Sequence, residues 1–323
     1  MKRHELWRLQ YRQRRYLEHL SEQDLQQRAK DILCNITVLT DTGKIGLHPV
    51  EDEGGYWIEI FTHLLEEFQI RFGPFPAGFT NGFIKEAQII TPTWPDAPKS
   101  VIAIKDKTFS SSPYLVKYGK ECHVRKTLEK GVIRIAPASF YADPSLNAAI
   151  KDNELEISIH THPSDVYIEH IDKKSGVPTA RITPFGNVTY TLKAPTNYYV
   201  YCLSSKYIYR AFDDFEADCA LLIKEPREFL KRLFRAFSKK LNSWRNFATA
   251  VTYIDPMNTH PSDLDVFFCK HFRYAYQKEY RAIWLPPSPE KHLEPVMLEL
   301  GNLQQICELV RIPSLDESVK ETE

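Results

Sequence analysis

The sequence predicts an α+β protein in which a mainly helical N-terminal domain precedes a domain built on twisted antiparallel sheets. Three observations support this prediction. Apolar residues recur at helical spacing through much of the N-terminal region, whereas short β-prone runs separated by turn residues follow Tyr114. Prolines between Pro92 and Pro113 separate the two patterns, as is typical of a domain edge. We therefore expect one domain at residues 1–105, a second at 106–313 and an acidic tail at 314–323.

Helices are expected first along the chain. Apolar residues repeat with helical spacing up to Leu20, and Ser21 with Asp24 resembles a capping box that begins a second helix ending near Leu33. Residues 58–70 carry a third apolar stripe. This N-terminal region matches no motif, and its expected roles are target recognition, docking of an inhibitor, or completion of the core.

Strands dominate the second domain. A helix at residues 121–130 should end at Gly131, since glycine is favoured just past a helix end, and another should cover 225–241. A hairpin is expected over 181–193, around the Gly186-Asn187 pair. The expected strands are 114–118, 132–135, 152–159, 198–203, 248–254, 280–285 and 295–300.

Composition excludes several classes of protein. The 42 basic and 42 acidic residues cancel, so no overall charge draws the chain to nucleic acid or membrane. The basic start, from Lys2 to Arg15, favours the solvated face of a helix over an RNA-binding surface. No apolar run approaches the roughly 20 residues needed to span a bilayer. Six scattered cysteines without a C-x-x-C pair indicate reduced thiols, and we expect a cytoplasmic protein with no membrane partner.

Two histidines, His160 and His162, form an H-x-H-P sequence that would place both imidazoles on one face of a strand, a geometry suited to zinc. It is similar to the metal-binding motif of JAMM-type isopeptidases, although His170 stands where that motif has serine. The string T-H-P-S-D at 161–165 recurs at 259–263, which favours a proline turn capped by serine or aspartate. We expect no bound metal, and a zinc-dependent hydrolase stays open as an alternative.

Gln277 and Glu279 form a second candidate pair. In an extended strand, residues two apart point to the same face, so an amide and a carboxylate would lie side by side. That pairing suits chemistry in which one group orients an acceptor and the other stabilises a sugar cation. A short Q-x-E string also occurs by chance, and Glu279 with Arg281 would equally form an ordinary ion pair.

Segments upstream of Gln277 and Glu279 support a functional interpretation of the pair. In order they are V-K-Y-G at 116–119, a helix ending at Gly131, Y-A-D-P at 141–144, D-N-E-L at 152–155, V-Y-C-L-S at 200–204 and Y-Q-K-E-Y-R at 276–281. Over residues 114–300 this order resembles a widespread bacterial family that looks like a divergent version of the ADP-ribosyltransferase fold. In that fold, a strand–helix–Gly-strand opening cups NAD, and a late Q/E-x-E strand supplies the catalytic glutamate.

The resemblance implies split antiparallel sheets, NAD as co-substrate, and a cleft between the Lys117 strand and the Glu279 strand. Each position carries an implied role, taken residue by residue from the matching segments. Glu279 and Gln277 would be catalytic, Lys117 and Tyr118 would hold the adenosine side of NAD, Tyr141 would cover the nicotinamide, Ser204 would prop the site, and Arg281 would meet the pyrophosphate or pin Glu279.

The expected function is therefore an NAD-dependent ADP-ribosyltransferase that modifies a macromolecule, either protein, RNA or DNA. By family analogy it would be an intracellular toxin or phage-defence effector, with an antitoxin or inhibitor protein as a possible partner. Two alternatives stay open: the zinc hydrolase at His160 and His162, and a non-catalytic interaction protein on the same fold.

Overall fold

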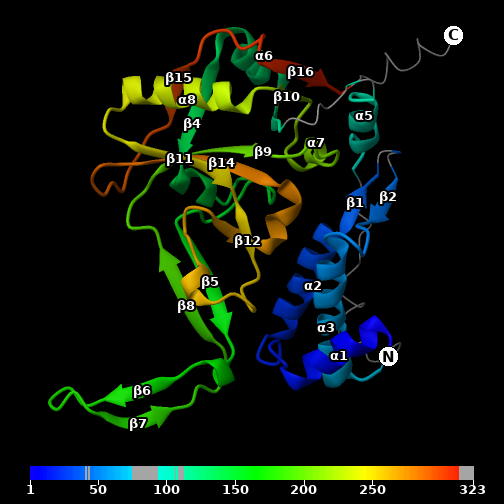
Figure 1. The fold of residues 1–323 in the computed structure, drawn as a ribbon, viewed down its shortest axis with the longest axis vertical. Helices are drawn as coiled ribbons and strands as arrows, with labels where there is room; N and C mark the ends of the chain where they lie inside the picture. The colour runs from blue at the N-terminus through cyan, green and yellow to red at the C-terminus, as the bar shows by residue number, and fades with distance from the viewer. Residues whose placement is uncertain (41, 43, 75–93, 106, 108–112, 313–323) are drawn as a thin grey trace.

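A layer of helices forms the N-terminal part of this computed structural model, which describes the whole chain except residues 41, 43, 75–93, 106, 108–112 and 313–323. The acidic tail and part of the expected domain edge therefore lie outside the described residues. The three longer helices lie beside the lower half of the molecule in Figure 1, in blue, and a short fourth helix lies above them, in teal. They are α1 (Arg3–Gln13), α2 (Glu22–Ile36), α3 (Gly54–Phe72) and the short α5 (Ala97–Ile102), with the antiparallel ribbon β1 (Thr37–Leu39) and β2 (Ile45–Leu47).

The predicted start of α2 is confirmed. The Ser21 side chain accepts a hydrogen bond from the backbone N–H of Asp24 at 3.1 Å, which satisfies one of the free donors in the first turn. The third predicted helix is also present, and α3 begins four residues earlier than the apolar stripe indicated.

The helical layer shares its core with the second half of the chain. Leu25, Leu64 and Phe68, from α2 and α3, belong to one apolar cluster with Met257 and Phe272. The apolar cluster of the helical layer therefore continues across the expected boundary near residue 105, whereas the sheet has a separate cluster formed only by residues beyond it.

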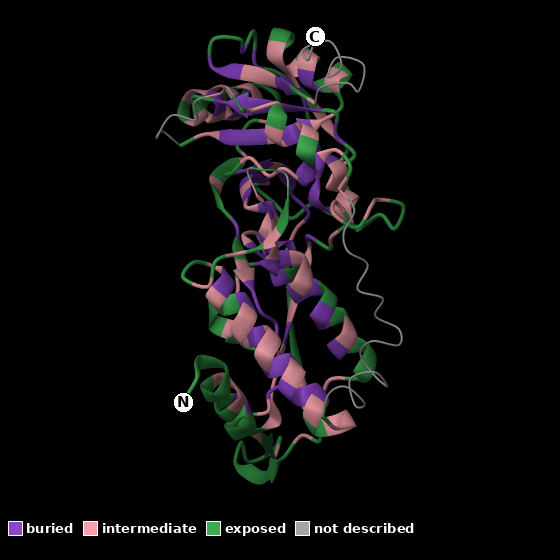
Figure 2. Ribbon diagram, turned by 90° about the vertical axis from the view of Figure 1, so that its right-hand side faces the viewer, coloured by how far each residue is buried: buried purple, intermediate pink, exposed green. Residues whose placement is uncertain are grey.

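An eight-stranded antiparallel sheet forms the upper part of the molecule (Figure 1). Its strands run in the order β11-β14-β9-β3-β10-β16, and β4 pairs with both β9 and β15. Figure 2 shows buried strands at the centre of this sheet, where β9, β10 and β14 are mostly buried, whereas the edge strand β11 is largely exposed. The strands are β3 (Leu115–Gly119), β4 (Val132–Pro137), β9 (Tyr199–Ser204), β10 (Cys219–Ile223), β11 (Arg245–Ala250), β14 (Glu279–Leu285), β15 (Val296–Glu299) and β16 (Cys307–Arg311).

The two faces of the sheet are covered differently. Helices α6 (Glu121–Lys130) and α8 (Pro226–Lys240) pack on one face, where the ring of Phe237 stacks on Trp284 at 4.6 Å between centroids. As predicted, α6 ends at Gly131, which has a φ of 68° that glycine tolerates best. The short α7 (Ala211–Asp214) packs against the opposite face of β3.

Strand β9 changes partner along its length. Ser204 pairs with Val116 of β3, whereas Val200 pairs with Ala136 of β4. The sheet is therefore split at β9, where β3 and β4 diverge. In this gap the Lys117 side chain donates a hydrogen bond to the main-chain carbonyl of Cys202 at 2.8 Å.

Three two-stranded ribbons extend below the sheet. Strands β5 (Glu156–Thr161) and β8 (Val188–Lys193) pair antiparallel, as do β6 (Ile168–Ile171) and β7 (Pro178–Ile182), and the second pair projects from the lower end in Figure 1. Strands β12 (Thr252–Ile254) and β13 (Cys269–His271) pair in parallel.

The predicted hairpin over residues 181–193 is wrong. Strand β7 pairs with β6 and β8 pairs with β5, so Gly186 and Asn187 connect two different ribbons. The turn that does close a hairpin lies between β6 and β7. There Asp172 accepts hydrogen bonds from the backbone N–H groups of Lys174 and Ser175, at 2.9 and 2.8 Å.

The α+β class is thus confirmed, with helices concentrated at the N-terminus and mostly antiparallel strands after it. Among the described residues, none of the helices combines the length and apolar character that crossing a membrane requires.

Candidate functional site

A cavity of about 470 Å³ opens beside the split in the sheet, on the face opposite α8. All of its lining residues lie between positions 116 and 279, so none comes from the N-terminal helices. Its size falls in the range of roughly 300–1,000 Å³ that is common for small-molecule sites. Six of the predicted site residues line it: Lys117, Tyr118, Tyr141, Ser204, Gln277 and Glu279.

Glu279 is the first residue of β14, and its carboxylate lies at the cavity wall. One carboxylate oxygen accepts from Arg281 Nε at 2.8 Å, and the other accepts from Lys270 Nζ at 3.1 Å. The Cys202 thiol also donates to it. Burial alone would raise the pKa of Glu279, but the adjacent Arg281 and Lys270 cations outweigh it and lower the pKa well below the usual range. The side chain is therefore ionised at neutral pH.

Lys270 and Glu154 were not predicted, yet they complete the wall behind Glu279. Lys270 Nζ lies 3.6 Å from Glu154 and 3.5 Å from Asp152, and both Lys270 and Glu154 are about 5% exposed. Burial raises the pKa of Glu154 even though Arg281 lies beside it. Three carboxylates surround two cations, so the network carries one excess negative charge when all five groups are ionised.

Arg281 does not line the cavity. It is fully buried beneath it, with Nη2 2.8 Å from Glu154 and Nη1 donating to the Phe267 carbonyl at 2.9 Å. Of its two expected roles, contact with a pyrophosphate and anchoring of Glu279, the structure places it in the second. The rule that residues two apart in a strand share a face applies here, because Glu279 and Arg281 both belong to β14.

The same rule does not apply to Gln277 and Glu279, and that expectation is corrected. Gln277 ends the 3₁₀ segment η4 (Phe272–Gln277), and Lys278 then adopts a left-handed conformation with a φ of 47°. Gln277 therefore reaches the cavity from a turn rather than from the strand. Its amide Nε2 donates to the Ala149 carbonyl at 2.8 Å, which fixes the side chain.

Ser204 holds three segments together. Its backbone pairs with Val116 and Glu279, and its hydroxyl oxygen lies 2.8 Å from the carbonyl oxygens of both Gln277 and Lys206, to either of which it can donate. The sequence expectation that this serine props the site agrees with these contacts.

Aromatic and basic side chains form the rest of the cavity. The Tyr118 hydroxyl accepts from the backbone N–H of Ile208 at 2.6 Å, which fixes the ring, and Tyr141 lines the wall from the 3₁₀ segment η1 (Ala138–Ala142). Arg134 stacks over the Phe140 ring at 4.8 Å. Burial lowers the pKa of Lys117, which also lies 4.7 Å from the Tyr201 ring. One hollow thus combines an acidic wall, rings and cations.

His160 and His162 do not share a site. Strand β5 ends at Thr161, so His162 lies outside the strand and the alternation that would pair the imidazoles stops before it. His160 Nδ1 contacts the Thr189 hydroxyl at 3.0 Å, whereas His162 Nε2 contacts Glu18 at 2.8 Å.

The repeated T-H-P-S-D string does form a proline turn at both places, as predicted. These are the 3₁₀ segments η2 (Pro163–Asp165) and η3 (Pro261–Asp263). The capping group is the histidine, however, and not serine or aspartate: the Nδ1 atoms of His162 and His260 accept from the backbone N–H of Ser164 and Ser262, at 3.2 and 3.3 Å.

The sequence gives only a weak indication of the wall residues that were not predicted. Lys270 is a charged residue inside the aromatic run 267–276, and Asp152 and Glu154 were assigned to a strand that begins only at Glu156. No protein-family model, curated protein or solved structure matches this chain.

Proposed function

We propose that the chain is an NAD-dependent ADP-ribosyltransferase whose NAD site is the cavity beside the split in the sheet. One observation carries the proposal: side chains from four distant segments, which a family resemblance singled out by sequence alone, line one hollow. The split of the sheet at β9 supports an ADP-ribosyltransferase-like fold for residues 114–300.

The reaction breaks the bond between nicotinamide and the ribose carbon. The bonding electrons leave with the nicotinamide nitrogen, and the ribose develops an oxocarbenium-like cation, as it does in glycoside cleavage. A nucleophile on the acceptor then bonds to that carbon and loses its proton. The enzyme must therefore place negative charge beside the ribose before the bond breaks.

Glu279 has the properties that this step requires. It is ionised at neutral pH, and with all five groups of its network ionised the one excess negative charge favours a cation in the cavity. A carboxylate offers about four acceptor positions. Arg281, Lys270 and Cys202 occupy three, which leaves one for a ribose hydroxyl.

The remaining lining suits the rest of NAD. Tyr118 and Tyr141 provide rings for stacking on adenine and nicotinamide. Lys117 and Arg134 provide cations for the pyrophosphate. The acceptor would be a protein, RNA or DNA. By family analogy, the biological setting would be a toxin or phage-defence effector controlled by an antitoxin or inhibitor.

The test uses full-length protein and NAD labelled in its adenylate half. Incubation with a whole-cell lysate should transfer label to the protein, RNA or DNA fraction, and free nicotinamide should appear. Glu279→Gln should lower NAD consumption by about 10²–10³-fold, because it deletes one preorganised charge. The fold should persist, since two carboxylates still face two cations.

Glu299→Gln is the matched control, because Glu299 is exposed on β15 and distant in sequence from the cavity residues. Its consumption of NAD should equal that of the wild type. Undiminished NAD consumption by the Glu279 variant would remove the glutamate from the proposed role. NAD binding without any turnover by the wild type would instead favour the non-catalytic interaction protein.

A further inference from the structure

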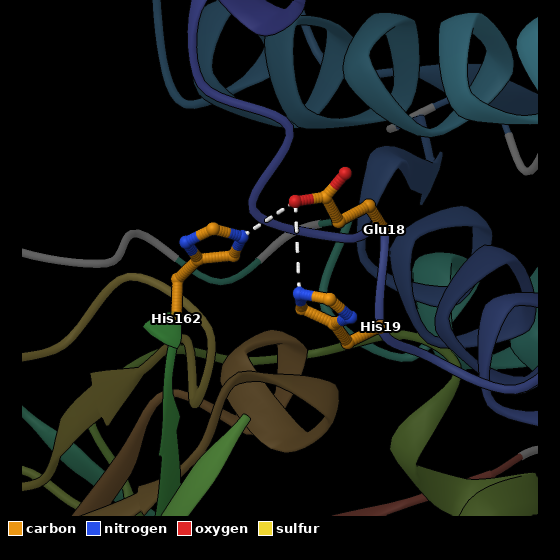
Figure 3. Close-up of side chains that lie close together, drawn as sticks. All are labelled: Glu18, His19 and His162. Carbon is orange, nitrogen blue, oxygen red and sulfur yellow. Dashed lines mark hydrogen bonds and ion pairs between the residues drawn. The ribbon is translucent and has the colours of Figure 1, made fainter. Parts of the chain in front are cut away.

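Three potential metal ligands meet where the helical layer touches the second domain. Figure 3 shows the imidazoles of His19 and His162 directed at one carboxylate oxygen of Glu18. That oxygen lies 2.8 Å from His162 Nε2 and 3.6 Å from His19 Nε2. The two rings are nearly parallel, with centroids 5.2 Å apart. Among the described residues this is the one group of three or more His, Cys, Asp or Glu side chains close enough to share an ion.

The spacing of these atoms suits a tetrahedral ion. Zinc binds nitrogen and oxygen ligands at roughly 2.0–2.1 Å, so neighbouring ligand atoms in a tetrahedron lie about 3.3 Å apart. The distances from the Glu18 oxygen to the two histidine nitrogens fall on either side of this value. Small side-chain rotations would therefore allow all three atoms to coordinate one ion, and two histidines with one glutamate form a known zinc donor set.

The ligands come from two parts of the molecule. Glu18 and His19 lie in the turn between α1 and α2, and His162 lies between β5 and η2. His19 also lines a cleft of about 580 Å³ between the helical layer and the second domain. An ion here would thus join the two parts at the rim of that cleft.

We propose that Glu18, His19 and His162 bind a zinc ion that ties the helical layer to the second domain, with water at the fourth position. The proposal is independent of the proposed NAD chemistry, since none of these residues lines the NAD cavity. Motif spacing in the sequence could not reveal this site, because Glu18 lies 144 residues upstream of His162.

The surroundings of His162 suit a metal ligand. Its Nδ1 atom lies 2.7 Å from the Ser164 hydroxyl, which itself contacts Asp165 at 3.2 Å. With Nε2 on the metal, the Nδ1–H would donate to the Ser164 hydroxyl in place of accepting from the Ser164 backbone. Such outer partners orient a ligating imidazole.

Binding is tested by titrating ZnCl₂ into chelator-treated, full-length protein and measuring heat and stoichiometry. One zinc per chain is expected for the wild type. Replacing any one ligand, in Glu18→Gln, His19→Ala or His162→Ala, should weaken binding by at least about tenfold. Co²⁺ should give the visible absorption of a tetrahedral site, which these variants should lose.

His260→Ala is the matched control. It removes the same cap from the second copy of the motif but lies outside the cluster, so zinc binding should be unchanged. His160→Ala should also bind zinc normally. Absence of one-to-one binding, retention of full affinity in the ligand variants, or equal loss in His260→Ala would overturn the site.

The tie between the two parts needs its own measurement. Adding ZnCl₂ should slow amide hydrogen exchange both in residues 14–21 and in residues 162–166, and it should not do so in His162→Ala. Protection of one segment alone would overturn the joining role even if zinc binds.

Discussion

The cavity proposed to bind NAD and the cleft next to it share one wall, and different parts of the chain line them. Glu154 and Lys270 line both hollows. Every other lining residue of the cavity lies between positions 116 and 279, whereas the cleft is also lined by residues of α2, such as Arg28. The chemistry proposed for the cavity therefore needs no side chain from the helical layer, which is free to act in target choice or inhibition.

The largest effect is expected at the shared wall. Lys270→Met removes a buried cation from three carboxylates, and the remaining unpaired charge should cost about 3–5 kcal/mol in the free energy of unfolding. Urea denaturation measures this loss. Lys173→Met, on the exposed hairpin, should change stability by less than about 0.5 kcal/mol. Equal stability of the two variants would mean that the wall is not held by its charges.

The next largest effect on stability is expected at an ion pair whose arginine lines the cleft but not the cavity. Arg28 forms a buried two-point ion pair with Asp255, at 2.8 and 2.6 Å, across the join between α2 and the second half. Arg28→Met should lower the free energy of unfolding by about 3 kcal/mol, because Asp255 stays buried. The double variant Arg28→Met with Asp255→Asn should recover part of the lost free energy of unfolding, because no unpaired carboxylate stays buried.

NAD consumption by Arg28→Met, measured well below its unfolding temperature, should stay within about twofold of the wild type, since Arg28 does not line the cavity. A large loss of turnover in a folded Arg28 variant would show that the cavity depends on the helical layer.

Much of this arrangement could be predicted from the sequence, because local patterns determine it. Helix α6 and its stop at Gly131 follow from propensity and a glycine cap, and the cap at Ser21 follows from its own neighbours. The residues of β3, β9 and β14 that line the cavity could be proposed from the sequence, because their order along the chain resembles that of a family.

What the sequence could not predict depends on distant partners. Lys270 belongs to the site because it forms ion pairs with Glu154 and Glu279, and these residues come together only in the folded protein. The false hairpin at Gly186 has the same origin, since a local turn signal cannot say which strand a segment will pair with. His162 likewise finds Glu18 only across the join of the two parts.

As the pH falls, we expect His271 in the cleft to reduce the stability of the fold at a higher pH than Glu279 in the cavity does. His271 lines the cleft, and burial, with Arg273 nearby, lowers its pKa to about 3 from 6.5. Between these values the unfolded chain binds a proton that the folded chain does not, so stability falls as the pH drops below 6.5. The expected loss of stability from this group is about 1.2 kcal/mol between pH 6 and pH 5.

Glu279 follows the same sign in a lower window of pH, because its folded pKa also lies below the unfolded value. Its folded pKa is depressed, so its contribution is present above the unfolded value of about 4.3 and is lost only as the pH falls through the folded pKa. Urea denaturation at pH 7, 6 and 5 tests the contribution of His271. The free energy of unfolding of the wild type should fall as the pH drops, and it should fall less in His271→Asn. An equal slope in both proteins would mean that another group titrates.

The smallest effect concerns the acceptor side of the cavity. Gln277 is fixed by its hydrogen bond to the Ala149 carbonyl, and the proposed reaction assigns the chemistry at the ribose to Glu279. Gln277→Ala should therefore leave NAD hydrolysis to water within about twofold of the wild type. Transfer of label to the macromolecular acceptor should fall by up to about tenfold, as loss of one positioning hydrogen bond of about 0.5–1.5 kcal/mol allows. Parallel assays of free ADP-ribose and labelled acceptor measure the two outcomes, and an equal fall in both would place Gln277 with Glu279 in bond cleavage instead.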